Sequence, residues 1–268
     1  MIGSFSRLRN ATLLVLLTLA TVQCSGLFKS KTAGELSLQG QALFREVAES
    51  NLPWTVWDKS VQQRDIYLLE LGSGEDVTVI FGGFHGNERL GAELVFRFAE
   101  YLYREQLPAD ARVILVPVVN PDGLVAGTRS NAGRVDVNRN FPTANWQPYD
   151  GSRQNYHGPS PASEPETRAV MALLDKYHPR KIVSVHTPLE VVNYDGPGQA
   201  LAEAMARHNG YPVKADIGYP TPGSFGTYAG VEKQIPVITL ELPRRATFGD
   251  IWPANREALW EAVRFREE

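Results

Sequence analysis

The chain has 268 residues, and its contents of 43% hydrophobic and 21% charged residues are ordinary for a globular protein. A formal net charge of -3, without a basic stripe, argues against a nucleic-acid partner. The single cysteine, Cys24, excludes an internal disulfide, so the hydrophobic core has to stabilise the fold by itself.

The first 24 residues are predicted to be a signal peptide. Two arginines precede a short apolar run at residues 11–22, an order typical of a secretory signal and too short for a comfortable membrane span. Cys24 follows this run, and the alternatives are lipid attachment there, ordinary cleavage near Ser25 or Gly26, and an uncleaved anchor. We therefore expect an exported protein of the bacterial cell envelope or periplasm, with membrane attachment through a lipidated Cys24 as one alternative.

Apolar strands and helices alternate through the rest of the chain, after a lead-in segment expected at residues 25–60. Strands are predicted at 66–71, 77–81, 113–119, 182–186, 191–194 and 236–240, and helices at 41–50, 90–104, 163–177, 199–208 and 254–265. Ser163 and Glu166 form a capping-box pattern at the start of one helix. The alternation predicts a single α/β domain at residues 61–268 with a largely parallel or mixed sheet.

A polar loop region at residues 120–161 is too long for a plain connector. Long loops in compact domains are usually functional, and sites in α/β sheets form beyond the carboxyl ends of the strands. The loop carries Arg129 and Arg139, whose guanidinium groups suit a substrate carboxylate or a developing oxyanion. For either arginine, a solvated surface position is the alternative.

Two buried-strand patterns end in a histidine. His85 follows the strand at 77–81 after two glycines, with Glu88 three residues later, and His186 ends the strand at 182–186. Alone, each histidine is more often a hydrogen-bonded core residue. Together with Glu88 they give the two histidines and one glutamate of a catalytic zinc site, so the sequence predicts one zinc ion per chain.

Glu241 ends a third apolar strand. A carboxylate in this position is costly unless it is exposed or has a partner. Near a zinc site it would accept a proton from the attacking water and later give it to a leaving amine. The alternative is a rim carboxylate paired with Arg244 or Arg245.

The order of the motifs resembles the zinc carboxypeptidase family over roughly residues 60 to 245. The motifs are H-G-N-E, N-P-D-G, T-R, V-N-R-N-F-P, S-V-H and T-L-E-L. The resemblance implies a mixed, mostly parallel eight-stranded sheet flanked by helices. It also implies that His85, Glu88 and His186 bind zinc and that Glu241 is the general base.

The same resemblance implies roles for the loop residues. Arg129 would stabilise the oxyanion, and Asn138 and Arg139 would bind the terminal carboxylate of a peptide substrate. A mobile tyrosine of the family corresponds to Tyr219, although Tyr228 is an alternative. The expected partner is therefore a peptide with a free C-terminal carboxylate.

Within the family, the chain resembles the small bacterial murein peptide amidases, which cleave between γ-D-glutamate and meso-diaminopimelate. The likeness lies in residues 128–131, 140–146, 163–167 and 220–228. The expected function is a zinc-dependent metallocarboxypeptidase acting on murein peptides. Alternatives are an ordinary metallocarboxypeptidase for protein C-termini, a deacylase like aspartoacylase or succinylglutamate desuccinylase, and a non-catalytic peptidoglycan-binding lipoprotein. Asp195 is expected to be a turn residue, with contact to the second amine of diaminopimelate as an alternative.

Overall fold

The computed structural model describes residues 32–148 and 156–266. The predicted signal peptide and Cys24 lie outside these residues. The chain from Thr32 onward forms one compact unit. Within the described residues, no helix is both long enough and apolar enough to cross a bilayer.

The elements alternate along the chain much as the apolar pattern predicts. The helical elements are α1 (Ala33–Glu49), α2 (Arg89–Leu102), α3 (Pro121–Ala126), η1 (Val137–Arg139), α4 (Pro165–Tyr177), α5 (Gln199–Asn209), η2 (Gly226–Glu232) and α6 (Phe248–Arg264). The strands are β1 (Thr55–Lys59), β2 (Asp65–Gly72), β3 (Asp76–Gly82), β4 (Ala111–Val116), β5 (Lys181–His186), β6 (Leu189–Asp195), β7 (Val213–Lys214) and β8 (Val237–Pro243).

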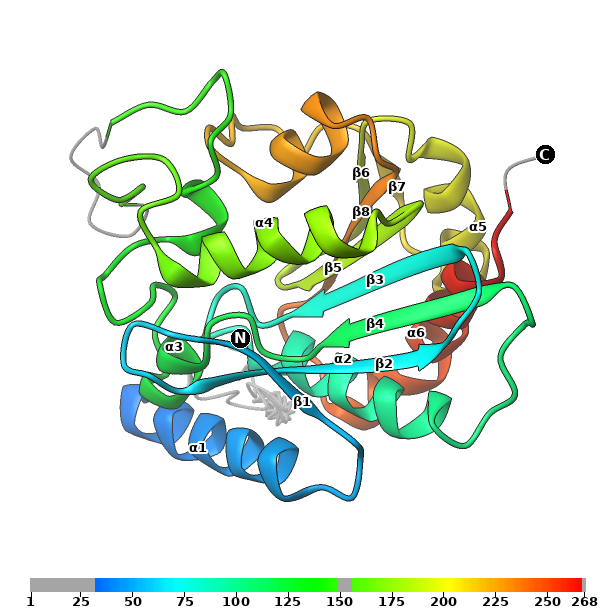
Figure 1. Ribbon diagram of the computed structural model, residues 1–268, viewed down its shortest axis with the longest axis horizontal. Coiled ribbons are helices and arrows are strands. Elements are labelled where there is room, and N and C mark those ends of the chain that lie inside the picture. The colour runs from blue at the N-terminus through cyan, green and yellow to red at the C-terminus, as the bar shows by residue number, and fades with distance from the viewer. Residues whose placement is uncertain (1–31, 149–155, 267–268) are drawn as a thin grey trace, which may run out of the picture. The chain divides into compact units, whose positions relative to one another are not determined.

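An eight-stranded mixed sheet lies at the centre, which confirms the expected fold class (Figure 1). Its strand order is β1-β2-β4-β3-β5-β8-β6-β7. The pairs β3–β4, β3–β5, β5–β8 and β6–β7 are parallel, and the other three pairs are antiparallel. Because β3, β5 and β8 are parallel neighbours, their carboxyl ends lie side by side at the same end of the sheet.

Helices cover both faces of the sheet, so its central strands are apolar on both sides. Helix α4 lies on one face, whereas α2 and α6 lie on the other (Figure 1). Successive side chains of β3 alternate between the two: Val79 and Phe81 pack in the core with α4, and Ile80 packs in the core with α2, α5 and α6. All residues of β3 and β5 are buried, which fixes the position of the chain segments that follow them.

Three helix starts differ from the prediction. Helix α6 begins at Phe248, six residues before residue 254, and Thr247 and Asp250 form a capping box at its start. Helix α1 begins eight residues earlier than residue 41, because Thr32 and Glu35 form a capping box there. The capping box predicted at Ser163 is wrong: Glu164 is the N-cap of α4 and makes no side-chain cap. The Glu166 carboxylate instead accepts hydrogen bonds from the Asn131 side chain and from the backbone of a residue before β2. Short elements such as β1, β7 and α3 carry too little periodicity to be predicted.

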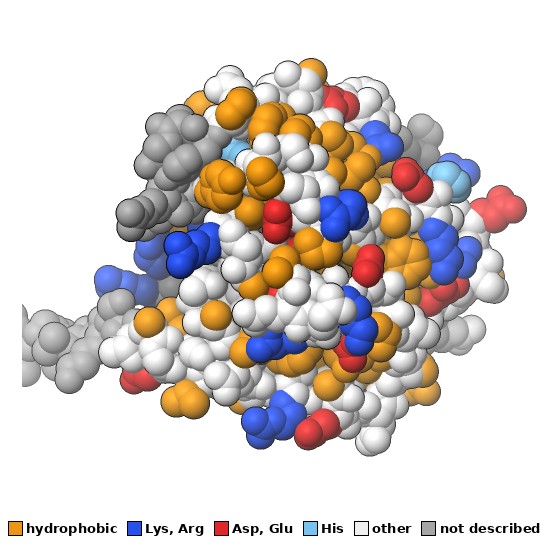
Figure 2. Space-filling model, turned by 60° about the vertical axis from the view of Figure 1, so that its left-hand side comes forward, with side chains coloured by type: hydrophobic (Ala, Val, Ile, Leu, Met, Phe, Trp, Pro, Cys, Tyr) orange, Lys and Arg blue, Asp and Glu red, His pale blue; other side chains and the backbone are white. Residues whose placement is uncertain are grey.

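Acidic and basic side chains are interspersed over most of the face shown in Figure 2. On this face the mixed pattern is that of an ordinary solvated surface. It agrees with the small net charge of the sequence.

Candidate active site

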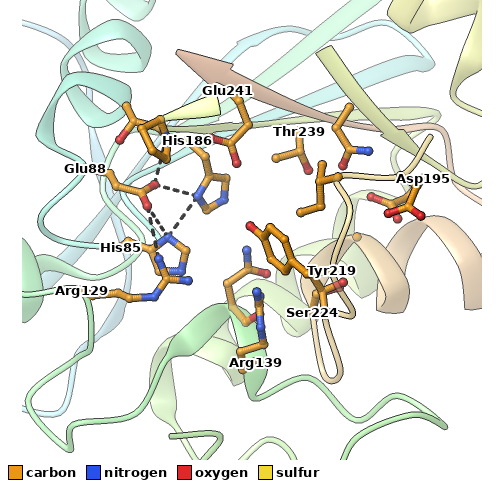
Figure 3. Close-up of a pocket in the computed structure, with 18 of the residues that line it drawn as sticks. His85, Glu88, Arg129, Arg139, His186, Asp195, Tyr219, Ser224, Thr239 and Glu241 are labelled. Carbon is orange, nitrogen blue, oxygen red and sulfur yellow. Dashed lines mark hydrogen bonds and ion pairs between the residues drawn. The ribbon is translucent and has the colours of Figure 1, made fainter. Parts of the chain in front are cut away.

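The predicted metal ligands and base meet at the carboxyl ends of three neighbouring parallel strands (Figure 3). His186, the last residue of β5, pairs in register with Glu241 on β8. On the other side of β5, β3 ends at Gly82, three residues before His85. Glu88 is the N-cap residue of α2. Parallel pairing thus brings together side chains that lie more than 150 residues apart in the sequence.

Three buried side chains form a compact set of metal-ligand atoms. The Nδ1 atom of His85 lies 2.8 Å from Oε1 of Glu88, and the Nδ1 atom of His186 lies 2.9 Å from Oε2 of Glu88. The two Nδ1 atoms are 3.2 Å apart. Ligand atoms of a tetrahedral ion with bonds of about 2.1 Å are separated by roughly 3.4 Å. The spacing therefore fits a small tetrahedral cation such as zinc.

The tautomer of His85 also fits a metal ligand. Its Nε2 atom lies 3.0 Å from Oδ1 of Asp136, a carboxylate without exposed surface. An ionised carboxylate only accepts hydrogen bonds, so the contact with Asp136 requires a proton on Nε2, and a cation bound beside Glu88 would take the lone pair of Nδ1. A cation between the two Nδ1 atoms would resolve their close approach, and Asp136 would orient the ligand as carboxylates commonly do in zinc sites.

The pKa values of both carboxylates reflect this arrangement. Burial by itself would raise the pKa of Asp136, but the nearby charges of His85 and Arg129 hold it well below its usual range. Burial would likewise raise the pKa of Glu88, and the adjacent His85 and His186 hold it low. Both carboxylates are therefore ionised, as a ligand and a histidine-orienting group must be.

The N-P-D-G and H-G-N-E segments are packed directly against each other. A Cβ atom on Gly86 would lie 1.8 Å from the carbonyl carbon of Gly123, so only glycine allows this approach. The side chain of Asn120 caps α3 by accepting from the Gly123 N–H at 2.8 Å, and its amide donates to the carbonyl oxygens of Phe84 and Arg129. These contacts fix the loop that carries Arg129 beside the metal ligands.

Arg129 lies next to the metal-ligand set. Its Nε donates to Oδ2 of Asp136 at 2.9 Å, and its NH1 lies 3.5 Å from Oε1 of Glu88. Arg129 and Tyr219 both line the pocket that opens beside His85 and His186. The guanidinium is therefore positioned by two carboxylates, Asp136 and Glu88, at the wall of the pocket.

Arg139 is buried and also lines the pocket. Its NH1 donates to the carbonyl oxygen of Asn138 at 2.7 Å. Among the residues that the structure describes, no carboxylate forms an ion pair with it, and burial lowers its pKa. The side-chain oxygen of Asn138 accepts from the Phe225 N–H at 2.8 Å, which leaves the Asn138 amide group for the pocket. Arg139 and Asn138 thus offer donors to an external anion.

Glu241 is buried at the pocket wall rather than at an exposed rim. Burial raises the pKa of its carboxyl group, although the charge of His186 opposes the shift. Its Oε2 accepts a hydrogen bond from the Leu189 N–H at 3.4 Å. Within residues 32–148 and 156–266, no ion pair joins it to Arg244 or Arg245, so the structure does not support the alternative of a paired rim carboxylate.

The sequence profile of the zinc carboxypeptidase family matches residues 54–200, more than half of the chain. The chain belongs to the zinc carboxypeptidase family. Murein peptide amidase A of Vibrio campbellii is 36% identical over 178 residues, which cover 62% of this chain and 68% of that protein. Murein peptide amidase A of Escherichia coli K12 is 34% identical over 176 residues, covering 62% and 70%.

The crystal structure of the murein-tripeptide amidase from Escherichia coli O157 superposes with a TM-score of 0.69 at 26% identity. The match covers 84% of this chain and 97% of that chain. The family profile includes His85, Glu88, Arg129, Arg139 and His186 but ends before Glu241. The position of Glu241 at the site of this zinc carboxypeptidase therefore follows from the strand register.

Of the two candidate tyrosines of this zinc carboxypeptidase, only Tyr219 lines the pocket. Its side chain is 51% exposed and points into the pocket in Figure 3. Tyr228 is buried and stacks on Phe141 with ring centroids 5.4 Å apart. Phe225 likewise packs in the aromatic core against Phe81 and Phe84, so it does not line the pocket.

Sequence reasoning missed Asp136 and misplaced Asp195. Asp136 directly precedes the V-N-R-N-F-P run, and an acidic residue close to several loop arginines was the only signal in the sequence. Asp195 was expected in a turn, but it is the last residue of β6 and lines the pocket. A charged residue at the end of an apolar strand is the same signal that marked His186 and Glu241.

Proposed function

We propose that this zinc carboxypeptidase hydrolyses murein peptides and cleaves the bond between γ-D-glutamate and meso-diaminopimelate. The observation that carries the proposal is the meeting of His85, Glu88 and His186 with Glu241 beside a pocket that also contains Arg139, a cation without an ion pair among the described residues. The names and the degree of identity of the two murein peptide amidases support this substrate class.

We propose that His85, Glu88 and His186 hold one zinc ion. When bound, this ion would supply a Lewis acid that activates water and polarises the scissile carbonyl. Asp136 keeps the proton of His85 on Nε2, so that Nδ1 faces the ion.

The remaining groups provide proton transfer and substrate positioning. Glu241 takes a proton from the attacking water and transfers it to the leaving amine, a step favoured by its raised pKa. Arg129 donates to the oxygen on which negative charge develops. Arg139 and the amide of Asn138 bind the terminal carboxylate, which places the last peptide bond next to Glu241. Tyr219 closes over the bound residue from the exposed side of the pocket.

The test is to incubate the purified zinc-loaded protein with L-alanyl-γ-D-glutamyl-meso-diaminopimelate and, separately, with an ordinary α-linked peptide. We expect mass spectrometry to detect free diaminopimelate and the remaining dipeptide, with the murein tripeptide consumed at least ten times faster. Cleavage of the α-linked peptide alone would instead establish an ordinary metallocarboxypeptidase. Cleavage only of N-acyl amino acids would establish the deacylase alternative.

We also propose that the protein acts in the cell envelope, where its first 24 residues direct export. Metabolic labelling with a radioactive fatty acid separates the two forms of export. Label on the wild-type protein that is lost in the Cys24→Ser variant would establish a lipid anchor. An unlabelled protein in the periplasmic fraction would establish ordinary signal cleavage, and a cytoplasmic protein would reject export.

A further inference from the structure

Arg244 is a third arginine at the pocket wall, and the proposed hydrolysis gives it no role. It begins the turn that follows β8, and its side chain is exposed. Arg129 and Arg139 line the same pocket, but the first is held by Asp136 and the second is buried. Arg244 therefore adds an exposed cation to the pocket wall.

No carboxylate neutralises Arg244 within residues 32–148 and 156–266, where its side chain forms neither an ion pair nor a hydrogen bond. Arginines elsewhere on the surface, such as Arg97 and Arg266, pair with a glutamate or an aspartate. The next residue, Arg245, is exposed as well but does not line the pocket. Its position at the pocket thus distinguishes Arg244 from an ordinary solvated arginine.

The backbone holds Arg244 at the same end of the sheet as the metal ligands. Pro243, the last residue of β8, pairs in register with Leu189 at the start of β6. Thr187 lies two residues before Leu189, and its N–H donates to Oε2 of Glu88 at 3.2 Å. Thr187 and Arg244 line the same pocket. A short path of paired backbone therefore joins Arg244 to the metal-ligand set.

The difference in burial between Arg139 and Arg244 sets the direction of a bound peptide. Arg139, which we propose to bind the terminal carboxylate, is only 8% exposed and enters the pocket from the side opposite Glu241 (Figure 3). A peptide whose end is held there extends toward the exposed part of the wall. Arg244 lies in that part, three residues after Glu241, or roughly 10 Å along the backbone. The residue on the N-terminal side of the scissile bond therefore comes close to Arg244.

A carboxylate on that residue would suit Arg244, because a guanidinium group binds a carboxylate through two parallel hydrogen bonds. In the proposed substrate, D-glutamate is linked through its side chain, so its α-carboxylate is free. This group is separated from the scissile carbonyl by as many bonds as the side-chain carboxylate of an α-linked glutamate. The carboxylates of Glu88 and Glu241 line the same pocket, so a substrate anion beside the scissile bond needs a cation nearby.

We infer that Arg244 is a specificity residue that binds a carboxylate on the residue N-terminal to the scissile bond. In a murein peptide, this group is the free α-carboxylate of D-glutamate. The inference rests on the proposed function and extends it to the other side of the scissile bond. D-isoglutamine, which has an uncharged amide in place of that carboxylate, lacks the group that Arg244 binds.

The test compares L-alanyl-γ-D-glutamyl-meso-diaminopimelate with the same tripeptide containing D-isoglutamine. We expect the wild type to favour the carboxylate about 10-fold in kcat/KM, the lower end for a charged hydrogen bond because solvent screens an exposed pair. Arg244→Ala should abolish this preference by lowering kcat/KM for the D-glutamate peptide alone. Arg244→Lys, which keeps the charge, should retain part of it. The control is Arg245→Ala, which removes an exposed arginine outside the pocket and should retain the whole preference.

Equal kcat/KM values for the two tripeptides in the wild type would overturn the inference while leaving murein peptidase activity established. A preference that Arg244→Ala leaves unchanged would overturn it as well. Cleavage of α-linked peptides alone would reject the murein substrate without deciding the role of Arg244. The same comparison, with glutamate or glutamine before the C-terminal residue, then decides it.

Calorimetry measures the same selectivity without turnover. The Glu241→Gln variant is the host, because it should bind zinc and peptide without hydrolysis. Tighter binding of the D-glutamate tripeptide than of the D-isoglutamine tripeptide, lost when Arg244→Ala is added, would support the inference. Equal binding of the two, or binding of neither, would reject it.

Discussion

His186 and Glu241 are register neighbours at the carboxyl ends of the adjacent parallel strands β5 and β8, and both line the same pocket. The pairing keeps the base close to the metal ligands without a direct hydrogen bond to them. The backbone pairing of the two strands fixes the positions of His186 and Glu241. A change to the Glu241 side chain should therefore alter proton transfer and leave the metal ligands in place.

Replacing Glu241 with glutamine should abolish turnover and preserve metal binding. The amide cannot accept the proton of the attacking water, so we expect kcat to fall by about 10³-fold. Zinc content measured by atomic absorption should equal that of the wild type. Turnover within tenfold of the wild type, at equal zinc content, would show that another group is the base.

Asp136→Ala should weaken metal binding although Asp136 is not itself a ligand. The variant removes the acceptor for the Nε2 proton of His85 and for the Nε of Arg129. We expect zinc affinity, measured by competition with a chromogenic chelator, to fall about 10- to 100-fold. The control Asp65→Ala removes a carboxylate that pairs with Lys59 at the surface and should not alter affinity. Equal affinities for both variants would contradict the orienting role.

Arg139→Ala should raise KM for peptides with a free C-terminal carboxylate. A charged hydrogen bond to this group contributes about 1.5–3 kcal/mol, so KM should rise roughly 10- to 100-fold. The peptide with an amidated C-terminus should be a poor substrate for both proteins and should not discriminate between them. Arg134→Ala, at an exposed arginine of the same loop, serves as the control. A KM unchanged by Arg139→Ala would rule out carboxylate anchoring at this position.

Asp195→Asn should stabilise the protein at neutral pH. Burial raises the pKa of this carboxyl from 3.8 to about 6, so the folded state binds more protons than the unfolded state between these values. The free energy of unfolding of the wild type therefore falls as pH rises through this window, and the variant lacks this loss. Its advantage should be near zero at pH 4 and about 1–3 kcal/mol above pH 6. Urea titrations at pH 4 and pH 7 measure this; a variant less stable than the wild type at pH 7 would contradict it.

Removing metal should lower both activity and thermal stability. The ligand atoms of His85, Glu88 and His186 are buried within 4.8 Å of one another, and an ion bound to this arrangement stabilises only the folded state. We expect dialysis against 1,10-phenanthroline to abolish turnover and to lower Tm by several degrees, and added zinc to restore both. A Tm that changes neither on chelation nor on addition of zinc would argue against a metal site at these residues.

The apolar periodicity was sufficient to predict the sheet and the long helices. Runs such as those around Ile80 and Val183 are buried on both faces, and that burial leaves a continuous apolar signal. The two-residue strand β7 and the one-turn helix η1 are held by tertiary contacts and leave no such signal. The start of α4 was misplaced because Glu166 is bound by Asn131, a contact between distant segments.

The sequence by itself determined which side chains have the chemistry of the site. Four residues stand out in the sequence: His85, Glu88, His186 and Glu241. Each is a polar group at or shortly after the end of a buried strand, where burial is unfavourable unless the group has a partner. The tertiary structure alone decided that they converge, since strand order and parallel register place β5 between β3 and β8. It also decided that Asp195 lines the pocket, because the packing of η2 on β6 partly buries that carboxylate, which has no hydrogen-bond or ion-pair partner within residues 32–148 and 156–266.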